Sequence, residues 1–468
     1  MSTFPPDAEL RRRFVHRPEL SLLYNRAHGL EHRLNPAAQI MAAAVLARSD
    51  TEAAGPDVSP ARRAALALAL PIERAAADLA AFWDTILTAP DRPRPVRKSG
   101  APADWAAVDV PFPLALEVEI TAACNWHCTF CYNTWKVSDT LGQRSASVTG
   151  TAPGLHLPLD TARRILDQAA AGGCLRIRLS GGEPTLHPQF REIVEHASAA
   201  GFDLELFTNG VRVDDAFAAW LTARRVRVLL VSLHGQAATH NALALNPAAY
   251  TQAIGGIRAG VAAGMTVMAE ALVSADNLAE MPAMVDTLRE LGVAHVSFMP
   301  YVATGPNDPC RPVAASAVAD LITHCRERTA GTVDFRVPCA PRHCLTDTPT
   351  AITAPVDEAF DDHCAAGLLW GSVSYDGYVR HCPHTGVVAG HVDEGIATVW
   401  TQRIVPTVRA ALEPDNDACG GCGQFAACKG GCHLPKVRAY PGVEQPPRRL
   451  LPLATAAPAR PKRSEGNR

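Results

Sequence analysis

The sequence predicts an α/β protein built on a partial barrel of six parallel strands, with a small α+β unit before the barrel and a cysteine-rich segment after it. Three observations support this prediction. Six apolar runs alternate with helical stretches between Leu116 and about residue 300. Glycines precede several of these runs. Seven of the 14 cysteines fall within two short windows, 124–131 and 419–432.

The first unit, residues 1–90, is predicted to be a winged-helix-like α+β domain. A hairpin is expected from the apolar stretches Leu20–Tyr24 and Leu30–Leu34. Asn35 and Pro36 then mark a helix start, because Asn accepts from the first free amides and Pro has no amide to leave unpaired. Helices should follow over about 36–47, 59–70 and 72–88. A Pro-rich, basic linker is expected over 91–111.

The barrel is expected over 112–310. Its strands are predicted at 116–120, 175–179, 203–207, 226–231, 265–273 and 295–299. Glycine ends a helix by taking the left-handed conformation at no steric cost, and four of these strands are preceded by such a residue. The glycines are Gly173, Gly201, Gly264 and Gly292. This βα repetition gives a parallel sheet with right-handed crossovers, and six strands rather than eight predict a partial TIM-like barrel.

Polar and glycine-rich loops follow the first four strands, with the sequences TAACNWHCTFC, SGGEP, TNG and SLHG. In barrels of this kind, the reactive groups lie in the loops after the carboxyl ends of the strands. The four loops are therefore expected on one face of the barrel, around a single active site.

The composition excludes several classes of partner. The formal net charge is −3, which gives no electrostatic footprint for nucleic acid or an anionic membrane. No apolar run approaches the roughly 18 residues of a membrane span. The amino terminus lacks the apolar region of a signal peptide, so we expect the reducing cytoplasm, where clustered thiols bind metal or carry out redox chemistry.

Three cysteines, Cys124, Cys128 and Cys131, have the spacing C-x3-C-x2-C within one loop. Three thiolates can hold three corners of an iron–sulfur cubane and leave the fourth iron open to a substrate or cofactor. A structural zinc site with a distant fourth ligand, or simple packing of thiols, is the alternative that the spacing leaves open.

This cysteine motif, with the following Tyr132, and the motif Gly181–Pro184 after the second strand resemble the radical S-adenosylmethionine (SAM) enzymes. The resemblance covers about 112–310. It implies that the three cysteines ligate a [4Fe–4S] cluster whose fourth iron chelates the amino and carboxylate groups of SAM. One electron would then cleave SAM, and the resulting 5′-deoxyadenosyl radical would abstract a hydrogen atom from the substrate.

The same resemblance implies six residues around SAM: Phe130, Gly181, Gly182, Glu183, Asn209 and Ser232. Phe130 would line the adenine, the two glycines would let the backbone approach the methionine moiety, and the Glu183 region would meet its ammonium group. Asn209 and Ser232 lie where contacts to ribose or carboxylate are expected, with an ordinary turn or cap role as the alternative. His234 is expected to face the site without an assigned role, and no catalytic residue is assigned.

Four more cysteines lie close together near the carboxyl terminus, in the pattern C-x2-C-x5-C-x3-C: Cys419, Cys422, Cys428 and Cys432. Taken alone, this run fits a zinc knuckle. With Cys364 and Cys382 upstream, it resembles the SPASM extension of radical SAM enzymes, expected here over 311–440.

The SPASM resemblance implies two auxiliary [4Fe–4S] clusters. The implied ligand sets are Cys364, Cys382 and Cys432 for one cluster, and Cys419, Cys422 and Cys428 for the other. Cys344 or Cys339 is the candidate to complete the first set. The family pattern has a further cysteine downstream, whereas no cysteine follows Cys432 here, so the second cluster lacks a clear fourth ligand.

The first unit resembles the PqqD-like fold, the recognition element for ribosomally synthesised and post-translationally modified peptides (RiPPs). The matching residues are LSLLYNRAHGLEHRLNPAAQIM and the later helix DLAAFWDTIL. The resemblance implies that residues 1–90 capture the leader of a precursor peptide as an added strand. A generic small domain that packs on the barrel is the alternative.

Together, these features predict a radical SAM/SPASM enzyme that modifies a ribosomally synthesised precursor peptide, by a thioether or by a carbon–carbon or carbon–oxygen crosslink. An electron donor such as flavodoxin or ferredoxin is the second expected partner. The alternatives are sulfatase-maturase-like oxidation of a Cys or Ser in a protein, peptide epimerisation, and a non-enzymatic zinc-containing peptide-binding scaffold. Residues 441–468 are expected to be a disordered tail.

Overall fold

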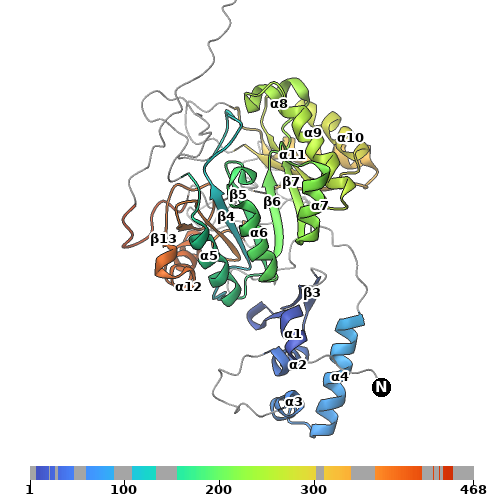
Figure 1. Ribbon diagram of the computed structural model, residues 1–468, viewed down its shortest axis with the longest axis vertical. Helices are drawn as coiled ribbons and strands as arrows, with labels where there is room; N and C mark the ends of the chain where they lie inside the picture. Colours follow the sequence, from blue (N-terminus) through green and yellow to red (C-terminus); the bar gives the residue numbers. More distant parts are fainter. Residues whose placement is uncertain are drawn as a thin grey trace, which may run out of the picture.

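The computed structural model describes most of the chain (Figure 1). The described residues are 7–20, 22–26, 30–46, 59–88, 108–132, 155–301, 310–338, 364–413, 425, 432 and 436–445. Several predicted features lie outside them, namely most of the linker, residues 446–468 of the tail, Cys339, Cys344, Cys419, Cys422 and Cys428. Among the described helices, none is long and apolar enough to cross a bilayer.

The described residues of the amino-terminal unit form a three-stranded antiparallel sheet and four helices. The strands are β1 (Phe14–Arg17), β2 (Leu22–Asn25) and β3 (Leu30–Arg33), in the order β1-β2-β3. The helices are α1 (Asp7–Arg13), α2 (Pro36–Leu46), α3 (Pro60–Leu68) and α4 (Ile72–Thr88). The predicted hairpin and three helices are confirmed. The start of α2 is also as predicted, because the Asn35 side chain accepts from the Ala38 amide at 2.8 Å.

The sequence did not predict α1 and β1. Helix α1 has seven residues and no apolar repeat, and β1 has only four residues, two of them basic. Their place is set by tertiary contacts: Phe14 of β1 packs edge-on against Trp83 of α4, with ring centroids 5.1 Å apart. Trp83 is fully buried in the core of this unit.

The barrel contains the six predicted strands, all parallel. They are β4 (Ala115–Thr121), β5 (Arg176–Gly181), β6 (Asp203–Thr208), β7 (Val226–Ser232), β8 (Thr266–Val273) and β9 (His295–Pro300). The helices between them are α5 (Leu159–Ala171), α6 (Phe190–Ala199), α7 (Asp215–Ala223), α8 (Ala237–Ala244), α9 (Ala249–Ala262) and α10 (Met281–Glu290). The four predicted helix-ending glycines have φ values of 73°, 84°, 73° and 85°, as the left-handed conformation requires.

The carboxyl-terminal segment extends the barrel sheet at both edges. On one side, α11 (Ala315–Thr329) leads to β10 (Asp334–Arg336), which pairs parallel with β9. On the other side, β11 (Trp370–Val373) pairs parallel with β4, and β12 (Tyr378–Arg380) and β13 (Gly390–His391) continue it antiparallel. Within the described ranges, the sheet therefore has ten strands in the order β10-β9-β8-β7-β6-β5-β4-β11-β12-β13.

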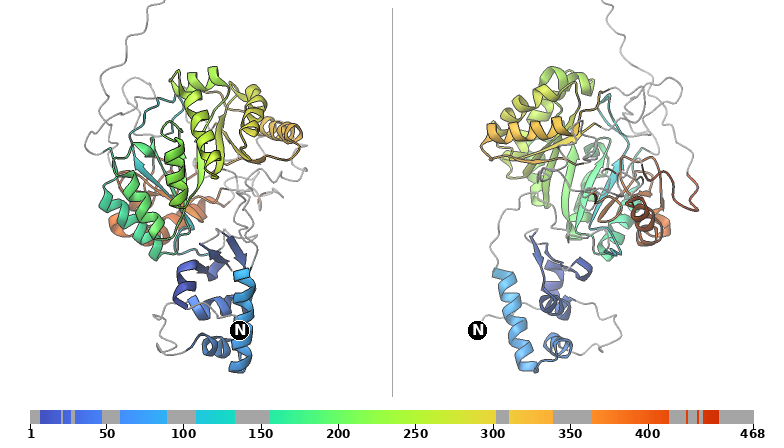
Figure 2. Two further views of the ribbon diagram at one scale, coloured as in Figure 1. Left: turned by 45° about the vertical axis from the view of Figure 1, so that its right-hand side comes forward. Right: turned by 180° about the vertical axis from the view of Figure 1, so that it is seen from behind.

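After β13, the helices α12 (Ile396–Val399) and α13 (Val405–Ala411) flank a π-helical turn at Trp400–Ile404. Helix α12 lies beside α5 (Figures 1 and 2), where the Gln168 side chain accepts from the Ile396 amide at 2.7 Å. Trp400 is buried and donates from its indole nitrogen to the Val110 carbonyl at 2.9 Å. These contacts join the carboxyl-terminal segment to the barrel.

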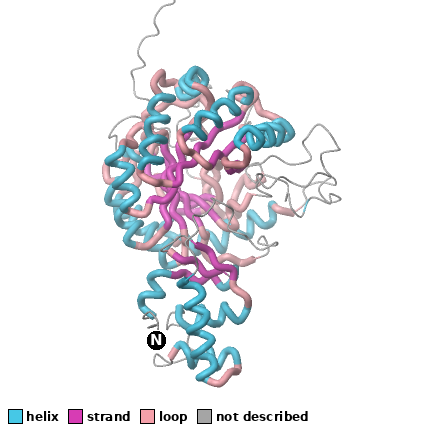
Figure 3. The backbone as a smooth tube through the Cα atoms, turned by 90° about the vertical axis from the view of Figure 1, so that its right-hand side faces the viewer, coloured by secondary structure: helices cyan, strands magenta, loops and turns pink. Residues whose placement is uncertain are grey.

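The sheet of the amino-terminal unit packs against the amino-terminal end of the barrel strands. In Figure 3 this sheet lies between the barrel and the helices of its own unit. The Arg17 guanidinium donates to the carbonyls of Phe112 and Gly173, each at 2.8 Å, and the Tyr24 hydroxyl donates to the Asp203 carboxylate. Phe112, Gly173 and Asp203 precede or begin strands, so this contact lies at the opposite end of the barrel from the loops that follow the strands.

Candidate functional site

The cysteine loop follows β4 and carries Cys124, Cys128 and Cys131. Cys124 is buried and the other two thiols are partly exposed. The loop rests on the end of α8, because the amides of His127 and Thr129 donate to the carbonyls of Ala244 and Leu243 at 3.2 and 2.9 Å. The three predicted ligands are therefore held on one short segment at the carboxyl end of the first barrel strand.

The end of β5 and the loop after it, at Gly181 and Gly182, lie very close to the end of β4 and the start of the cysteine loop. The Gly182 amide donates to the Thr121 carbonyl at 2.8 Å. A Cβ atom added at Gly181 would lie 2.2 Å from the Thr121 carbonyl oxygen, and one at Gly182 would lie 2.2 Å from that of Ala123. Gly181 also has a φ of +132°, which side chains rarely adopt. Glycine is thus required at both positions for the two loops to meet.

Glu183 is buried beneath these loops and joins the loops after β5 and β6. Its carboxylate accepts from the Thr185 amide and hydroxyl, at 3.1 and 2.5 Å, and from the Thr208 hydroxyl at 2.9 Å. It also accepts from the Asn209 amide at 2.8 Å. Burial raises the pKa of Glu183, while these donors favour its ionised form. Both carboxylate oxygens therefore bind groups of the protein.

Asn209 connects the loop after β6 to the cysteine loop. Its side-chain amide donates to the Asn125 side chain at 2.6 Å, and its own carbonyl oxygen accepts from the Val211 amide at 3.1 Å. Ser232 is the last residue of β7, next to the same group of loops. Five of the six predicted SAM-site residues thus lie at or just after the carboxyl ends of β5, β6 and β7, and Phe130 lies on the cysteine loop itself.

Two histidines from the region after β7 pack against aromatic residues of the cysteine loop. The Phe130 and His234 rings meet edge to face with centroids 4.6 Å apart, and the Trp126 and His240 rings do so at 5.3 Å. Burial lowers the pKa of both histidines, to about 4 for His240 and well below the ordinary value for His234. Both imidazoles are therefore neutral at physiological pH, which resolves the charge of His234.

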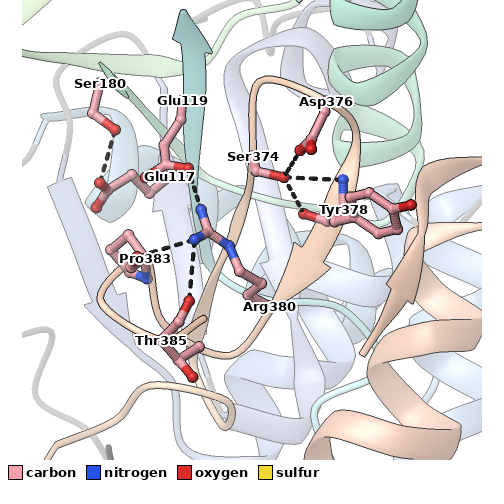
Figure 4. A network of polar contacts seen from close by, with 9 residues as sticks. All are labelled: Glu117, Glu119, Ser180, Ser374, Asp376, Tyr378, Arg380, Pro383 and Thr385. Atoms are coloured by element: carbon pink, nitrogen blue, oxygen red, sulfur yellow. Dashed lines mark hydrogen bonds and ion pairs between the residues drawn. The ribbon is translucent and has the colours of Figure 1, made fainter. Parts of the chain in front are cut away.

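A polar network that the sequence analysis missed lies on the inner side of β4 (Figure 4). The Arg380 guanidinium of β12 donates to the Glu119 carboxylate and to the carbonyls of Pro383 and Thr385, at 3.1 and 3.2 Å. Burial raises the pKa of Glu119 to about 7, against the opposing charge of Arg380. The run LEVEI could have indicated this network, because side chains alternate along a strand and both glutamates of β4 therefore lie on one face.

Glu117 and Glu270 are two further buried acidic groups near this network. The Ser180 hydroxyl donates to Glu117 at 2.8 Å, and burial raises the pKa of Glu117. Burial, reinforced by the charge of Glu117, raises the pKa of Glu270 to about 7. The Glu270 carboxyl can therefore take up a proton near neutral pH.

Three carboxyl-terminal cysteines, Cys364, Cys382 and Cys432, lie close enough to interact. Burial raises the pKa of the Cys382 thiol well above its ordinary value, and the neighbouring charges of Cys364 and Cys432 raise it further. The adjoining His384 ring meets the ring of Tyr132, directly after the cysteine loop, at a centroid distance of 4.3 Å. The structure therefore places the two cysteine regions side by side.

The donor sets at both places fit iron–sulfur clusters. Among the described side chains, no three His, Cys, Asp or Glu residues converge on a point that could hold a single metal ion. A cubane does not require such a point, because each thiolate binds a different iron atom. Three thiols on one loop leave one iron of a [4Fe–4S] cluster without a protein ligand, as a cluster that binds SAM requires.

Comparison with known proteins identifies relatives. Residues 118–308 match the model of the Radical SAM superfamily. AdoMet-dependent heme synthase of Methanosarcina barkeri is 28% identical over 343 residues, covering 70% of this chain and 92% of that protein. Mycofactocin maturase MftC of Mycobacterium ulcerans is 27% identical, covering 69% of this chain and 84% of that protein. PqqA peptide cyclase of Ruegeria pomeroyi is 27% identical, with coverages of 69% and 83%.

The solved structure of Streptococcus suis SuiB bound to precursor peptide SuiA shares the fold. Its TM-score is 0.62 at 16% sequence identity, and the match covers 91% of this chain and 95% of SuiB. Strands β4–β9, the cysteine loop and the two glycines after β5 all fall in or beside the residues that match the family model. Residues 118–308 are therefore a radical SAM enzyme domain with the α/β fold of that superfamily, and its cofactors are a [4Fe–4S] cluster and SAM.

Proposed function

We propose that this chain modifies a ribosomally synthesised precursor peptide. One observation carries the proposal. The chain combines a radical SAM domain with an amino-terminal unit that packs against it and contains a small antiparallel sheet. Two relatives are named as a maturase and a peptide cyclase. The likeness to SuiB covers 91% of the chain, so the shared fold must include much of residues 7–88.

The amino-terminal unit would bind the leader of the precursor on an open edge of its sheet. Strands β1 and β3 are the edges, and β2 is the central strand. An edge strand offers unpaired amides and carbonyls to an extended peptide, and the neighbouring side chains supply specificity. This role makes residues 1–90 the PqqD-like recognition element, with 91–111 as the linker to the barrel.

The docking geometry sets a minimum length for such a substrate. The amino-terminal unit contacts the beginnings of the barrel strands, whereas the cysteine loop follows their ends. Strand β4 has seven residues. At about 3.3 Å per residue it spans roughly 20 Å, so a docked peptide needs at least about seven extended residues between its leader and the modified residue.

The radical SAM domain would supply the chemistry, and the chain would position the reactants. When bound, the cluster and SAM supply hydrogen-atom abstraction from a carbon atom of the substrate. Cys124, Cys128 and Cys131 would hold the cluster, and the loops after β5, β6 and β7 would surround SAM. Buried carboxyls of the barrel, Glu119 among them, could exchange protons there. The product would be a thioether or a carbon–carbon or carbon–oxygen crosslink.

The carboxyl-terminal segment, 311–440, would be the SPASM domain. Cys364, Cys382 and Cys432 would hold one auxiliary cluster, and Cys419, Cys422 and Cys428, which lie outside the described residues, would hold another. Cys382→Ser should lower the iron content of the anaerobically reconstituted protein by the content of one cluster. Cys174→Ser is the matched control, because Cys174 is buried in the barrel core and should leave the iron content unchanged. A flavodoxin or ferredoxin in the cytoplasm would deliver the electron.

Coexpression with a candidate precursor peptide tests the proposed function. The loss of two hydrogen atoms per event, measured by mass spectrometry, is expected for a crosslink, and an unchanged mass with altered stereochemistry would indicate epimerisation. A Cys124→Ala/Cys128→Ala/Cys131→Ala variant should still bind the leader and should produce no 5′-deoxyadenosine. Oxidation of a Cys or Ser in a protein, or zinc in place of iron and sulfide, would overturn the proposal.

A further inference from the structure

His234 lies just after β7, between the cysteine loop and β8, and is 6% exposed. Its backbone amide donates to Nδ1 of His240 at 3.1 Å, and its carbonyl accepts from the Asn277 side chain at 2.8 Å. Its ring meets the Phe130 ring edge to face. The residue is therefore held rigidly from three sides.

The tautomer of His234 is fixed by the structure. The backbone amide of Leu272, in β8, donates to Nδ1 of His234 at 3.1 Å. A backbone amide can only donate, so Nδ1 must be the acceptor. Because burial keeps the imidazole neutral, its single proton lies on Nε2.

Nε2 of His234 is thus a donor with a fixed direction. It lies across the ring from Nδ1 and so faces away from β8. No described residue accepts a hydrogen bond from it, although the residue is almost fully buried. Nε2 itself keeps some accessible surface, so a bound molecule can reach it. In so enclosed a place, a bound group that supplies an acceptor gains a directed hydrogen bond.

We propose that His234 binds SAM, by donating a hydrogen bond from Nε2 to an acceptor atom of the adenosyl group. The position of His234 supports SAM as the ligand, because His234 contacts Phe130 of the cysteine loop and follows Ser232 by two residues. This inference rests on the radical SAM domain and not on the peptide substrate. A failure of the peptide proposal would leave it standing.

Two substitutions separate hydrogen bonding from packing. His234→Asn keeps an acceptor near the Nδ1 position for the Leu272 amide but removes the donor at Nε2. His234→Gln places an amide donor near the Nε2 position. We expect the Asn variant of the reconstituted full-length protein to bind SAM about 3- to 10-fold more weakly in anaerobic equilibrium dialysis, and the Gln variant to recover most of the affinity. Wild-type affinity in the Asn variant, or equal losses in both variants, would overturn the proposal.

SAM analogues identify the acceptor atom, beginning with the wild-type protein. Deaza analogues remove single ring nitrogens of the adenine, and deoxy analogues remove single ribose hydroxyls. One analogue should bind wild-type protein about 3- to 10-fold more weakly, with no further loss in His234→Asn. If every analogue binds the wild type as well as SAM does, His234 does not donate to the adenosyl group. The same conclusion holds if the affinity loss from each analogue is as large in His234→Asn as in the wild type.

Discussion

Arg380 and Glu119 form a buried ion pair that joins β12 of the carboxyl-terminal segment to β4, the strand that leads into the cysteine loop. The two side chains are 5% and 0% exposed. The same guanidinium holds the loop that carries Cys382 and His384, through the carbonyls of Pro383 and Thr385. One side chain therefore holds both the strand that leads into the cysteine loop and the loop that carries Cys382.

Removal of Arg380 should strongly destabilise the protein. Arg380→Met leaves the Glu119 carboxyl buried without its cation, and we expect a loss of about 3–5 kcal/mol in the free energy of unfolding. Urea unfolding measures this loss. Arg409→Met is the matched control, because its partner Asp109 is 89% exposed, and it should cost less than about 1 kcal/mol. Equal losses in the two variants would contradict the role of the buried pair.

Glu119 should make the stability depend on pH. Burial raises the pKa of Glu119 in the folded state to about 7, from an ordinary value of 4.5. The positive charge of Arg380 opposes this increase, whereas the negative charges of Glu117 and Asp376 reinforce it. Because the folded state binds this proton more tightly, the stabilisation is complete below about pH 4.5 and is lost as the pH rises through about 7. The stability of wild type relative to Glu119→Gln should therefore fall between about pH 5 and pH 8. A difference that is constant or rises with pH would show that burial does not dominate.

The close approach of the two loops predicts that Gly182→Ala disrupts the cysteine loop. The added Cβ would lie 2.2 Å from the Ala123 carbonyl oxygen, so backbone must move, at a cost of about 1–3 kcal/mol. We expect lower iron incorporation after anaerobic reconstitution. Gly255→Ala, in α9, is the control, because its added Cβ meets nothing within 4 Å, and it should stabilise the helix by about 0.5–1 kcal/mol. Normal iron content in Gly182→Ala would mean that the loops can separate without harm.

Local sequence signals predicted the parts of the fold that depend on local chemistry. The six strands β4–β9 follow from βα repetition, and the start of α2 follows from Asn35, whose side chain caps the helix as predicted. The pairing of β11 with β4 depends on residues more than 250 positions apart, for example Trp370 with Ala115, and no local pattern encodes it.

In the candidate site, too, local motifs were predicted from the sequence, and contacts between distant segments were not. The cysteine loop and the two glycines after β5 were found as motifs, because their spacing is set by local geometry. The contact between Tyr132 and His384 joins separate segments, so it required the structure. The Glu183 region was expected near the ammonium group of SAM, and the structure shows that the Glu183 carboxylate binds Thr185, Thr208 and Asn209.

Tyr24→Phe should weaken the docking of the amino-terminal unit on the barrel. The Tyr24 hydroxyl donates to Asp203, a carboxylate whose pKa burial raises to about 6 although Arg227 lies 2.9 Å away. Loss of this donor leaves a buried carboxylate less well satisfied, at a cost of about 1–3 kcal/mol. Faster hydrogen exchange in β2 with unchanged exchange in β7 would report weaker docking. Tyr378→Phe is the control, because its hydroxyl bonds to no described residue, and it should leave both strands unchanged. Equal exchange in wild type and Tyr24→Phe would show that Arg17 and the apolar contacts of Leu22 suffice to hold the unit.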